Sequence, residues 1–172
     1  MPIVYVPTGI LAQLERDVRR HHKRRKYRPV AVAIARDAEG RILLIRSTKG
    51  EKPWGFPQGG VEKKEGIING LRRELYEETR VRLSEVLELC LVDQLEIPGR
   101  RRDGFKLGKR YYYFHVACKG FPRVIPQPEE VCDHQWLFPQ QAIRVIANPR
   151  NTYPEKRESM LRALRITLHR GA

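Results

Sequence analysis

Three glutamates, Glu74, Glu77 and Glu78, have the spacing in this sequence that points most clearly to chemistry. Positions i, i+3 and i+4 share one face of a helix, where like charges repel each other by roughly 0.2–0.5 kcal/mol per pair. Clustered carboxylate oxygens suit Mg²⁺ or Mn²⁺, and a bound cation would make use of this repulsion. Arg72 and Arg73 offer a simpler explanation, an ordinary salt-bridged surface in which they pair with Glu77. Taken alone, the three glutamates favour the simpler explanation.

A wider pattern around the glutamates changes this interpretation. It reads Gly59, five residues, Glu65, seven residues, Arg73-Glu74-Leu75, one residue, Glu77-Glu78, two residues and Val81. These 23 residues resemble the Nudix box, the loop–helix–loop signature of a large family of pyrophosphohydrolases. The order of the flanking elements is similar to that of the family over residues 28–168. One position departs, because Arg80 stands where the family usually has glycine, and a left-handed arginine costs on the order of 1 kcal/mol.

The resemblance implies a role for each polar residue of the box. The implied metal ligands are the carbonyl of Gly59 and the carboxylates of Glu74, Glu77 and Glu78. Glu74 is either a ligand or the general base, and Arg73 is implied to orient a carboxylate such as that of Glu65. The implied cofactor is Mg²⁺ or Mn²⁺, which would neutralise phosphoanhydride oxygens, position the attacking water and lower its pKa.

Members of the family often add an acidic residue from a later loop. We choose Glu130 as this further metal ligand, because Glu130 and Trp136 reproduce the spacing of an acidic residue before a strand that contains Trp. Glu129 is a close alternative, and either glutamate would also be ordinary in a surface loop.

Residues outside the box suggest a subgroup. The segment Trp54-Gly55-Phe56-Pro57-Gln58 resembles the one that precedes the box in dinucleoside polyphosphate hydrolases and bacterial RNA 5′-pyrophosphohydrolases. Tyr153, Lys156 and Arg157 resemble an aromatic–basic cluster of the RNA-acting enzymes. The predicted substrate-binding residues are Trp54, Arg46, Lys49, Lys52, Tyr153 and Arg157, with the basic side chains of the 46–52 segment contacting phosphates.

A net charge of +14 and a pI of about 10.1 indicate a polyanionic partner, such as a nucleotide or an RNA 5′ end. Basic residues gather in two segments, 24–28 and 100–110, and together they could follow a phosphate backbone with salt-dependent affinity. Charged hairpin tips are often only solvated, so this interpretation stands beside a purely solvating one. The clustering favours an RNA 5′ end over a small free nucleotide.

The elements that would position these residues follow from the hydrophobic pattern. We expect an α+β fold, an α/β/α sandwich with a mixed sheet between helices, divided into a basic helical extension (1–27) and a hydrolase domain (28–172). The expected helices are 8–25, 66–79, 139–147 and 154–168, and the expected strands are 30–35, 41–46, 86–97, 111–118 and 134–138. Residues 47–60 are expected to form a loop, and the strands 30–35 and 41–46 a hairpin.

Composition narrows the remaining classes. No apolar run reaches the roughly 18 residues of a membrane span, and the first residues lack the order of a secretory signal. Three widely spaced cysteines without a CxxC pair predict reduced thiols in a cytoplasmic protein. Two alternatives to the proposed nucleotide substrates stay open, namely a non-catalytic Nudix-like module that binds nucleotide or RNA, and a hydrolase of inositol pyrophosphates or nucleoside diphosphate sugars.

Overall fold

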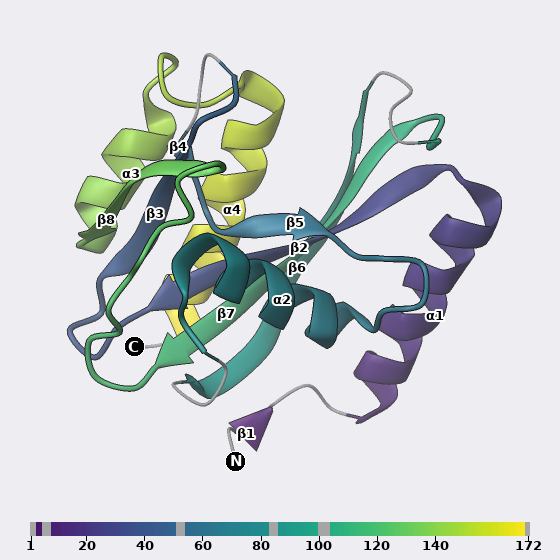
Figure 1. Cartoon of the computed structure of the whole chain (residues 1–172), viewed down its shortest axis with the longest axis horizontal. Helices are drawn as coiled ribbons and strands as arrows, with labels where there is room; N and C mark the ends of the chain where they lie inside the picture. The colour runs from purple at the N-terminus through teal and green to yellow at the C-terminus, as the bar shows by residue number, and fades with distance from the viewer. Residues whose placement is uncertain (1–2, 5–7, 51–53, 83–85, 100–103, 171–172) are drawn as a thin grey trace.

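The computed structural model describes the chain apart from residues 1–2, 5–7, 51–53, 83–85, 100–103 and 171–172 (Figure 1). The strands of the described chain are β1 (Ile3–Val4), β2 (Tyr27–Arg36), β3 (Ile42–Ser47), β4 (Trp54–Gly55), β5 (Gln58–Gly60), β6 (Val86–Pro98), β7 (Gly108–Cys118) and β8 (Val131–Leu137). The helices are α1 (Thr8–Arg24), α2 (Ile67–Thr79), α3 (Pro139–Ala147) and α4 (Pro154–Arg170).

The strands form one mixed sheet in the order β1-β6-β7-β2-β3-β4, with β5 paired to β2 and β8 paired to β3. The central strand β2 runs parallel to β7 over its whole length, from the pair Tyr27–Gly108 to the pair Arg36–Ala117. The β6–β7 pair is antiparallel, as are the pairs that β3 makes with β2, β4 and β8. The mixed sheet expected from the sequence is therefore confirmed.

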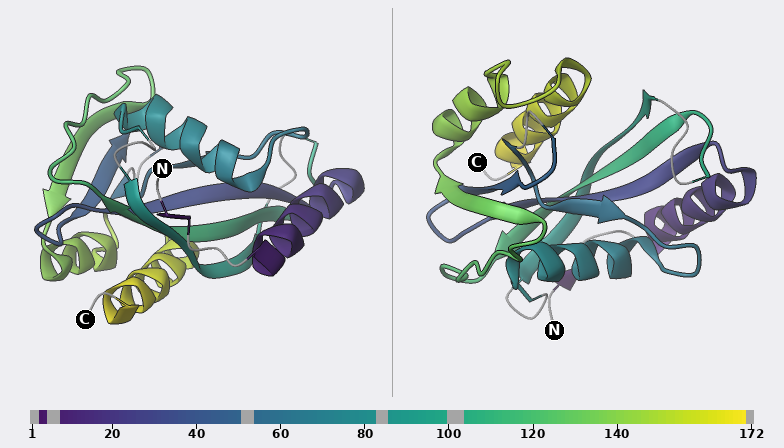
Figure 2. Two further views of the ribbon diagram at one scale, coloured as in Figure 1. Left: turned by 90° about the horizontal axis from the view of Figure 1, so that it is seen from below. Right: turned by 45° about the horizontal axis from the view of Figure 1, so that its top comes forward.

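Helices cover both faces of this sheet, and each face has its own apolar core. Leu14 and Val18 of α1 share one core with the apolar side chains of α2. Ala142 of α3 and Leu164 of α4 lie in the core on the other face. Figure 2 shows α2 on one side of the sheet and α3 and α4 on the other. The expected α/β/α layering is confirmed.

Polar contacts join α1 to the segment that contains the box. The carboxylate of Glu15 accepts a 2.8 Å hydrogen bond from the backbone N–H of Ile67, the first residue of α2. The ring of His22 donates to the carbonyl of Val61 at 2.9 Å. The division of the chain into an extension and a domain stays a prediction, but these contacts tie α1 directly to α2.

The segment 47–60 differs from the loop expected from the sequence, because it contains the short strands β4 and β5. Strand β5 pairs with β2 from Val30–Gly60 to Val32–Gln58, and it thereby occupies the edge of β2 that a regular hairpin would give to β3. The β2–β3 hairpin is consequently limited to the pair Arg36–Ile42 beside the turn. Strands of two or three residues carry too little periodicity to be recognised in a Gly- and Pro-rich sequence.

Within the described part of the chain, no helix combines the length and the apolar character needed to cross a bilayer. All three cysteines are free thiols, with Cys90 and Cys118 buried and Cys132 exposed.

Candidate active site

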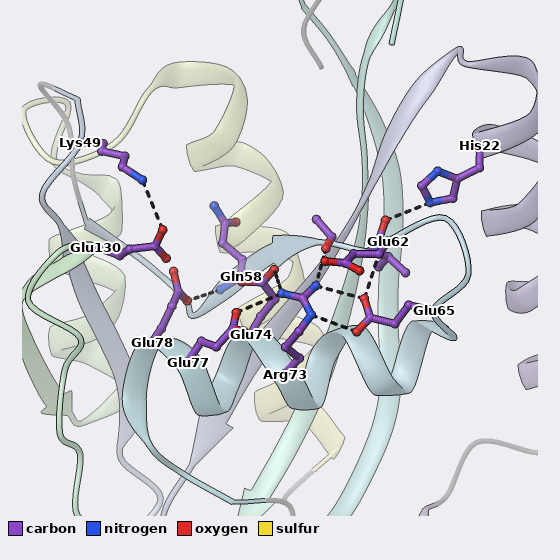
Figure 3. A network of polar contacts seen from close by, with 12 residues as sticks. His22, Lys49, Gln58, Glu62, Glu65, Arg73, Glu74, Glu77, Glu78 and Glu130 are labelled. Atoms are coloured by element: carbon purple, nitrogen blue, oxygen red, sulfur yellow. Dashed lines mark hydrogen bonds and ion pairs between the residues drawn. The ribbon is translucent and has the colours of Figure 1, made fainter. Parts of the chain in front are cut away.

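Helix α2 is oriented by its apolar stripe. Ile67, Leu71 and Leu75 are buried at spacings of four residues, which fixes one side of the helix against the sheet. The polar residues of the box consequently project toward β5 and the loop before β8 (Figure 3). Gly66 at the N-cap offers no side chain, and Glu15 of α1 supplies the missing acceptor at this end.

The far end of α2 keeps the left-handed cap despite its arginine. Arg80 has φ 62° and ψ 6°, and its N–H donates to the carbonyl of Tyr76 at 2.8 Å. Its guanidinium lies 5.2 Å from the centre of the Tyr76 ring, a favourable cation–π contact. The cap geometry of the box is therefore preserved where the sequence put it in question.

Gly59 brings the backbone of β5 directly against the carboxylate of Glu74. A Cβ atom added at Gly59 would lie 1.8 Å from the carboxyl carbon of Glu74, so no other residue fits here without displacing that side chain. Gly59 thus lets the backbone of β5 and the carboxylate of Glu74 on α2 line the same small space. This close approach is required if the Gly59 carbonyl and the Glu74 carboxylate are to bind one cation, as the resemblance predicts.

Arg73 lies at the centre of a hydrogen-bond network that fixes the carboxylates (Figure 3). Its Nε and Nη2 donate to the two oxygens of Glu65, each at 3.0 Å, and Nη2 also donates to the carbonyl of Gly60 at 2.8 Å. Nη1 donates to Glu74 at 2.7 Å and to Glu77 at 3.0 Å. Burial alone would raise the pKa of Glu65, but the bonds from Arg73 and the Glu62 backbone lower it below its ordinary value. Arg73 therefore acts as a brace within the site.

The network opens onto a pocket of about 310 Å³. Carboxylates of Glu74, Glu78 and Glu130 line the pocket together with Gly59. The cationic residues of its lining are Arg28, Lys49, Lys109 and Lys156. Acidic and basic groups thus face one another across a cavity open to solvent, the arrangement needed to hold a polyphosphate together with its counter-ion.

Glu130 reaches the pocket because the loop before β8 is fixed to β3. The N–H of Thr48 donates to the carbonyl of Glu130 at 2.9 Å, and the Thr48 hydroxyl donates to the carbonyl of Glu129 at 2.8 Å. The carboxylates of Glu130 and Glu78 point toward one another in Figure 3, and Lys49 donates to Glu130 at 3.3 Å. Glu129 is exposed and is not part of the pocket lining, so the geometry favours Glu130 of the two alternatives.

The carboxylates of the pocket are costly to ionise unless a cation lies beside them. Burial raises the pKa of Glu78 to about 8, and repulsion from Glu74 and Glu130 adds to the effect. Burial also raises the pKa of Glu74, although Arg73 opposes the shift. The opposing hydrogen bond to Glu78 comes from the N–H of Gln58 at 2.7 Å. Because a divalent cation would stabilise the ionised form of these groups, the residues present fit Mg²⁺ or Mn²⁺.

A family model described as the NUDIX domain matches residues 26–163. The chain belongs to the Nudix family. The RNA pyrophosphohydrolase of Teredinibacter turnerae is 38% identical over 68 residues, 40% of this chain and 39% of that protein. The RNA pyrophosphohydrolase of Rhodopseudomonas palustris strain BisB18 is 31% identical over 105 residues, 55% of this chain and 60% of that protein. The matched parts are thus less than two thirds of these relatives.

Solved structures share the Nudix fold with the chain. The Ap4A hydrolase of C. elegans has a TM-score of 0.61 at 20% identity, covering 83% of this chain and 98% of that one. A MutT protein of Methanosarcina mazei Go1 has a TM-score of 0.60 at 16% identity, covering 86% and 97%. At such identities the likeness shows the fold, and it agrees with the layers seen here.

The substrate-binding residues predicted from the sequence are not all part of the Nudix pocket. Lys49 lines it, whereas Lys52 lies outside the described residues. The others are described but are not part of the pocket lining: Arg46 is exposed, Trp54 packs against the core beneath α4, Tyr153 is 39% exposed, and Nη1 of Arg157 lies 3.5 Å from the carbonyl of Ala147. Their substrate contacts stay predictions.

Lys156 is a residue whose place in the site the sequence did not single out. It lies in the first turn of α4 and lines the pocket beside Gly55. Burial lowers the pKa of Lys156 to about 8, and Lys109 lowers it further while Glu78 opposes the shift. The sequence signal is the aromatic–basic cluster, from which the resemblance predicts Tyr153 and Arg157 as substrate-binding residues. Only the packing of α4 shows which cation turns inward.

Proposed function

We propose that this Nudix protein hydrolyses a phosphoanhydride bond of a nucleoside polyphosphate with the help of Mg²⁺ or Mn²⁺. The preferred substrate is an RNA 5′-triphosphate end, and a dinucleoside polyphosphate is the second choice. The observation that carries the proposal is the pocket in which Glu74, Glu78 and Glu130 face Arg28, Lys109 and Lys156. A polyphosphate requires both the acidic and the basic side chains. Its oxygens bind the basic side chains, whereas the metal ion that accompanies it must be held by the carboxylates.

The metal-binding part of the site would comprise Gly59 through its carbonyl, together with Glu74, Glu77, Glu78 and Glu130. A divalent ion bound there would neutralise the anhydride oxygens and lower the pKa of the attacking water. Arg73 holds Glu74 and Glu77 in place through its hydrogen bonds. Glu74 either binds the ion or accepts the proton of the water, and its raised pKa suits the second role.

The cationic side of the pocket would bind the phosphates. Arg28 presents its guanidinium beside Gly60, and Lys109 and Lys156 come from β7 and α4. The lowered pKa of Lys156 means that an approaching anion would stabilise its charged form, so phosphate binding and protonation of this amine reinforce each other. The three cations come from separate elements, which fixes the orientation of a multiply charged chain.

A surface that we name the basic ridge favours RNA over a small nucleotide. It consists of the exposed residues Arg16, Arg19, Lys23, Arg24, Arg25 and Lys26 along the second half of α1 and before β2. Arg28, the second residue of β2, lines the pocket. A phosphate backbone that starts in the pocket would find cations on its way out. Of the second basic segment, Arg100, Arg101 and Arg102 lie outside the described residues, and Arg110 is already paired with Asp17 at 3.1 Å.

The names of the relatives support the same substrate, since several are RNA pyrophosphohydrolases. The three free thiols, one of them exposed, suit a reducing compartment, and we propose the cytoplasm.

The test is turnover of a triphosphorylated RNA oligonucleotide, with diadenosine tetraphosphate, a nucleoside diphosphate sugar and an inositol pyrophosphate as parallel substrates. We expect product release with Mg²⁺ and none with a chelator, and the highest kcat/KM with RNA. Glu130→Gln should lower kcat/KM by at least about tenfold, whereas Glu129→Gln, its exposed neighbour, should leave it unchanged. RNA binding without turnover of any substrate under Mg²⁺ or Mn²⁺ would show a non-catalytic module instead.

A further inference from the structure

A second group of metal-ligating side chains lies on the β6–β7 pair. Cys90 of β6 stands directly opposite His115 of β7, and Glu88 lies two residues before Cys90. One ligand atom from each of the three side chains lies within 4.8 Å of the others. None of these residues lines the pocket of the candidate active site. The group is therefore distinct from the carboxylates of α2.

The pattern of the two strands places the three side chains on one face of the sheet. Leu89 and Val116 belong to the core beneath α1 and α2, so their neighbours Cys90 and His115 project to the opposite face. Cys90 and His115 are buried, whereas Glu88 is exposed. The position opposite Glu88 is Ala117. The strands thus present a buried thiol and a buried imidazole beside a carboxylate that reaches solvent.

These ligand types select a different metal from the one proposed for the pocket. Zn²⁺ accepts Cys sulfur at about 2.3 Å and His nitrogen or carboxylate oxygen at about 2.0–2.2 Å in a tetrahedral arrangement. Ligand atoms in such a site are about 3.5 Å apart, so small side-chain rotations would bring the present group onto an ion. Mg²⁺ prefers oxygen ligands alone and would not compete well here.

We propose that Glu88, Cys90 and His115 form a zinc site in which water would supply the fourth ligand. The ion would cross-link β6 and β7 on the face away from α2. Its expected consequence is a free energy of unfolding that rises with the logarithm of the zinc concentration above the Kd, because the ligand set exists only when the two strands are paired.

Co²⁺ is the probe that tests this site in the whole chain, with Mg²⁺ in excess to occupy the pocket. We expect one equivalent of Co²⁺ to give the visible bands of a tetrahedral ion and the near-ultraviolet band of a cobalt–thiolate bond. Zn²⁺ should displace both signals. Absence of these bands in the unaltered protein would overturn the proposal.

Variants separate this site from other thiols. Cys90→Ser should abolish the thiolate band, whereas Cys118→Ser, a buried thiol near the end of β7, should retain it. Glu88→Gln changes an exposed side chain, so it keeps the proposal testable if Cys90→Ser does not fold. It should weaken Zn²⁺ binding, measured by competition with a chromophoric chelator, by at least about tenfold. Unchanged affinity in Glu88→Gln, or an unchanged thiolate band in a folded Cys90→Ser, would refute the assignment.

Discussion

Helices α1 and α2 carry opposite charges and hold them in opposite ways. In α2 the acidic side chains are partly buried, braced by Arg73 and pressed against the backbone of β5. In α1 the side chains of Arg19, Lys23 and Arg24 face solvent, and within the described chain no side-chain hydrogen bond holds Arg19 or Lys23. Charge that is buried and fixed supports chemistry at one point, whereas solvated charge acts over distance and is screened by salt. The two helices meet where Glu15 caps α2.

The largest effect is expected from Gly59→Ala, which would disturb the buried and fixed carboxylates of α2. The new Cβ would overlap the carboxylate of Glu74. A displacement of this kind in an active site can cost about a hundredfold in rate, and we expect a loss of that order in kcat/KM for triphosphorylated RNA. Gly9→Ala in α1 is the control, because its Cβ would meet nothing within 4 Å. Equal losses in both variants would contradict the proposed close approach.

The second prediction concerns pH in the metal-free protein. Between the ordinary pKa of 4.5 and the raised pKa of about 8, native Glu78 holds a proton that the unfolded chain has lost. This group therefore makes the free energy of unfolding fall as pH rises through that range. Thermal unfolding should show Glu78→Gln gaining stability relative to the unaltered protein as pH increases. Mg²⁺ should restore the stability of the unaltered protein at the upper end of this pH range. A stability difference between the two proteins that does not vary with pH would argue against a buried, protonated Glu78.

The solvated cations of α1 predict a smaller effect, which depends on salt concentration. Replacing Arg19 and Lys23 by Gln should raise the KM for triphosphorylated RNA several-fold and leave kcat unchanged. If each cation meets one phosphate of the single strand, the slope of log KM against log salt should fall by about 1.4. The control removes the same charge elsewhere, through Arg144→Gln with Arg150→Gln. The KM for diadenosine tetraphosphate should be the same in the two double variants. If the ridge variant raised the KM for both substrates equally, the basic ridge would have no specific role in RNA binding.

The junction between the helices provides a fourth prediction. Glu15→Ala should lower the free energy of unfolding by about 1 kcal/mol, since it removes both the acceptor for the Ile67 N–H and a negative charge at the start of α2. Denaturant unfolding would measure the change. Glu158→Ala, an exposed carboxylate of α4, should change stability by much less. If both variants are equally stable, the contact does not cap α2.

The smallest effect is expected at the other end of α2. Arg80→Gly would relieve a left-handed residue worth about 1 kcal/mol but remove a cation–π contact worth about 0.5 kcal/mol. A net gain of about 0.5 kcal/mol follows from these two values. In a Tyr76→Leu background the gain should approach about 1 kcal/mol, because the contact is already absent. A loss of stability in that background would show that the arginine is not strained.

The sequence predicted the helices and long strands because their apolar residues repeat along the chain. It also predicted the shared face of Glu74, Glu77 and Glu78, since that face depends only on helical spacing. It could not show that Glu15 reaches Ile67 or that Lys156 turns into the pocket. Those contacts depend on how α1 and α4 pack, and nothing in the local spacing records the packing. The short strands β4 and β5 were missed for a different reason, their lack of a repeating pattern.

The cap that Glu15 places on α2 has a consequence for any shortened version of the protein. The family model begins at residue 26, after α1 has ended. A chain trimmed to that boundary would leave the Ile67 amide without its carboxylate partner, and it would strip Leu14 and Val18 from the core. Such a fragment would keep every residue of the catalytic signature and still hold its helix less firmly.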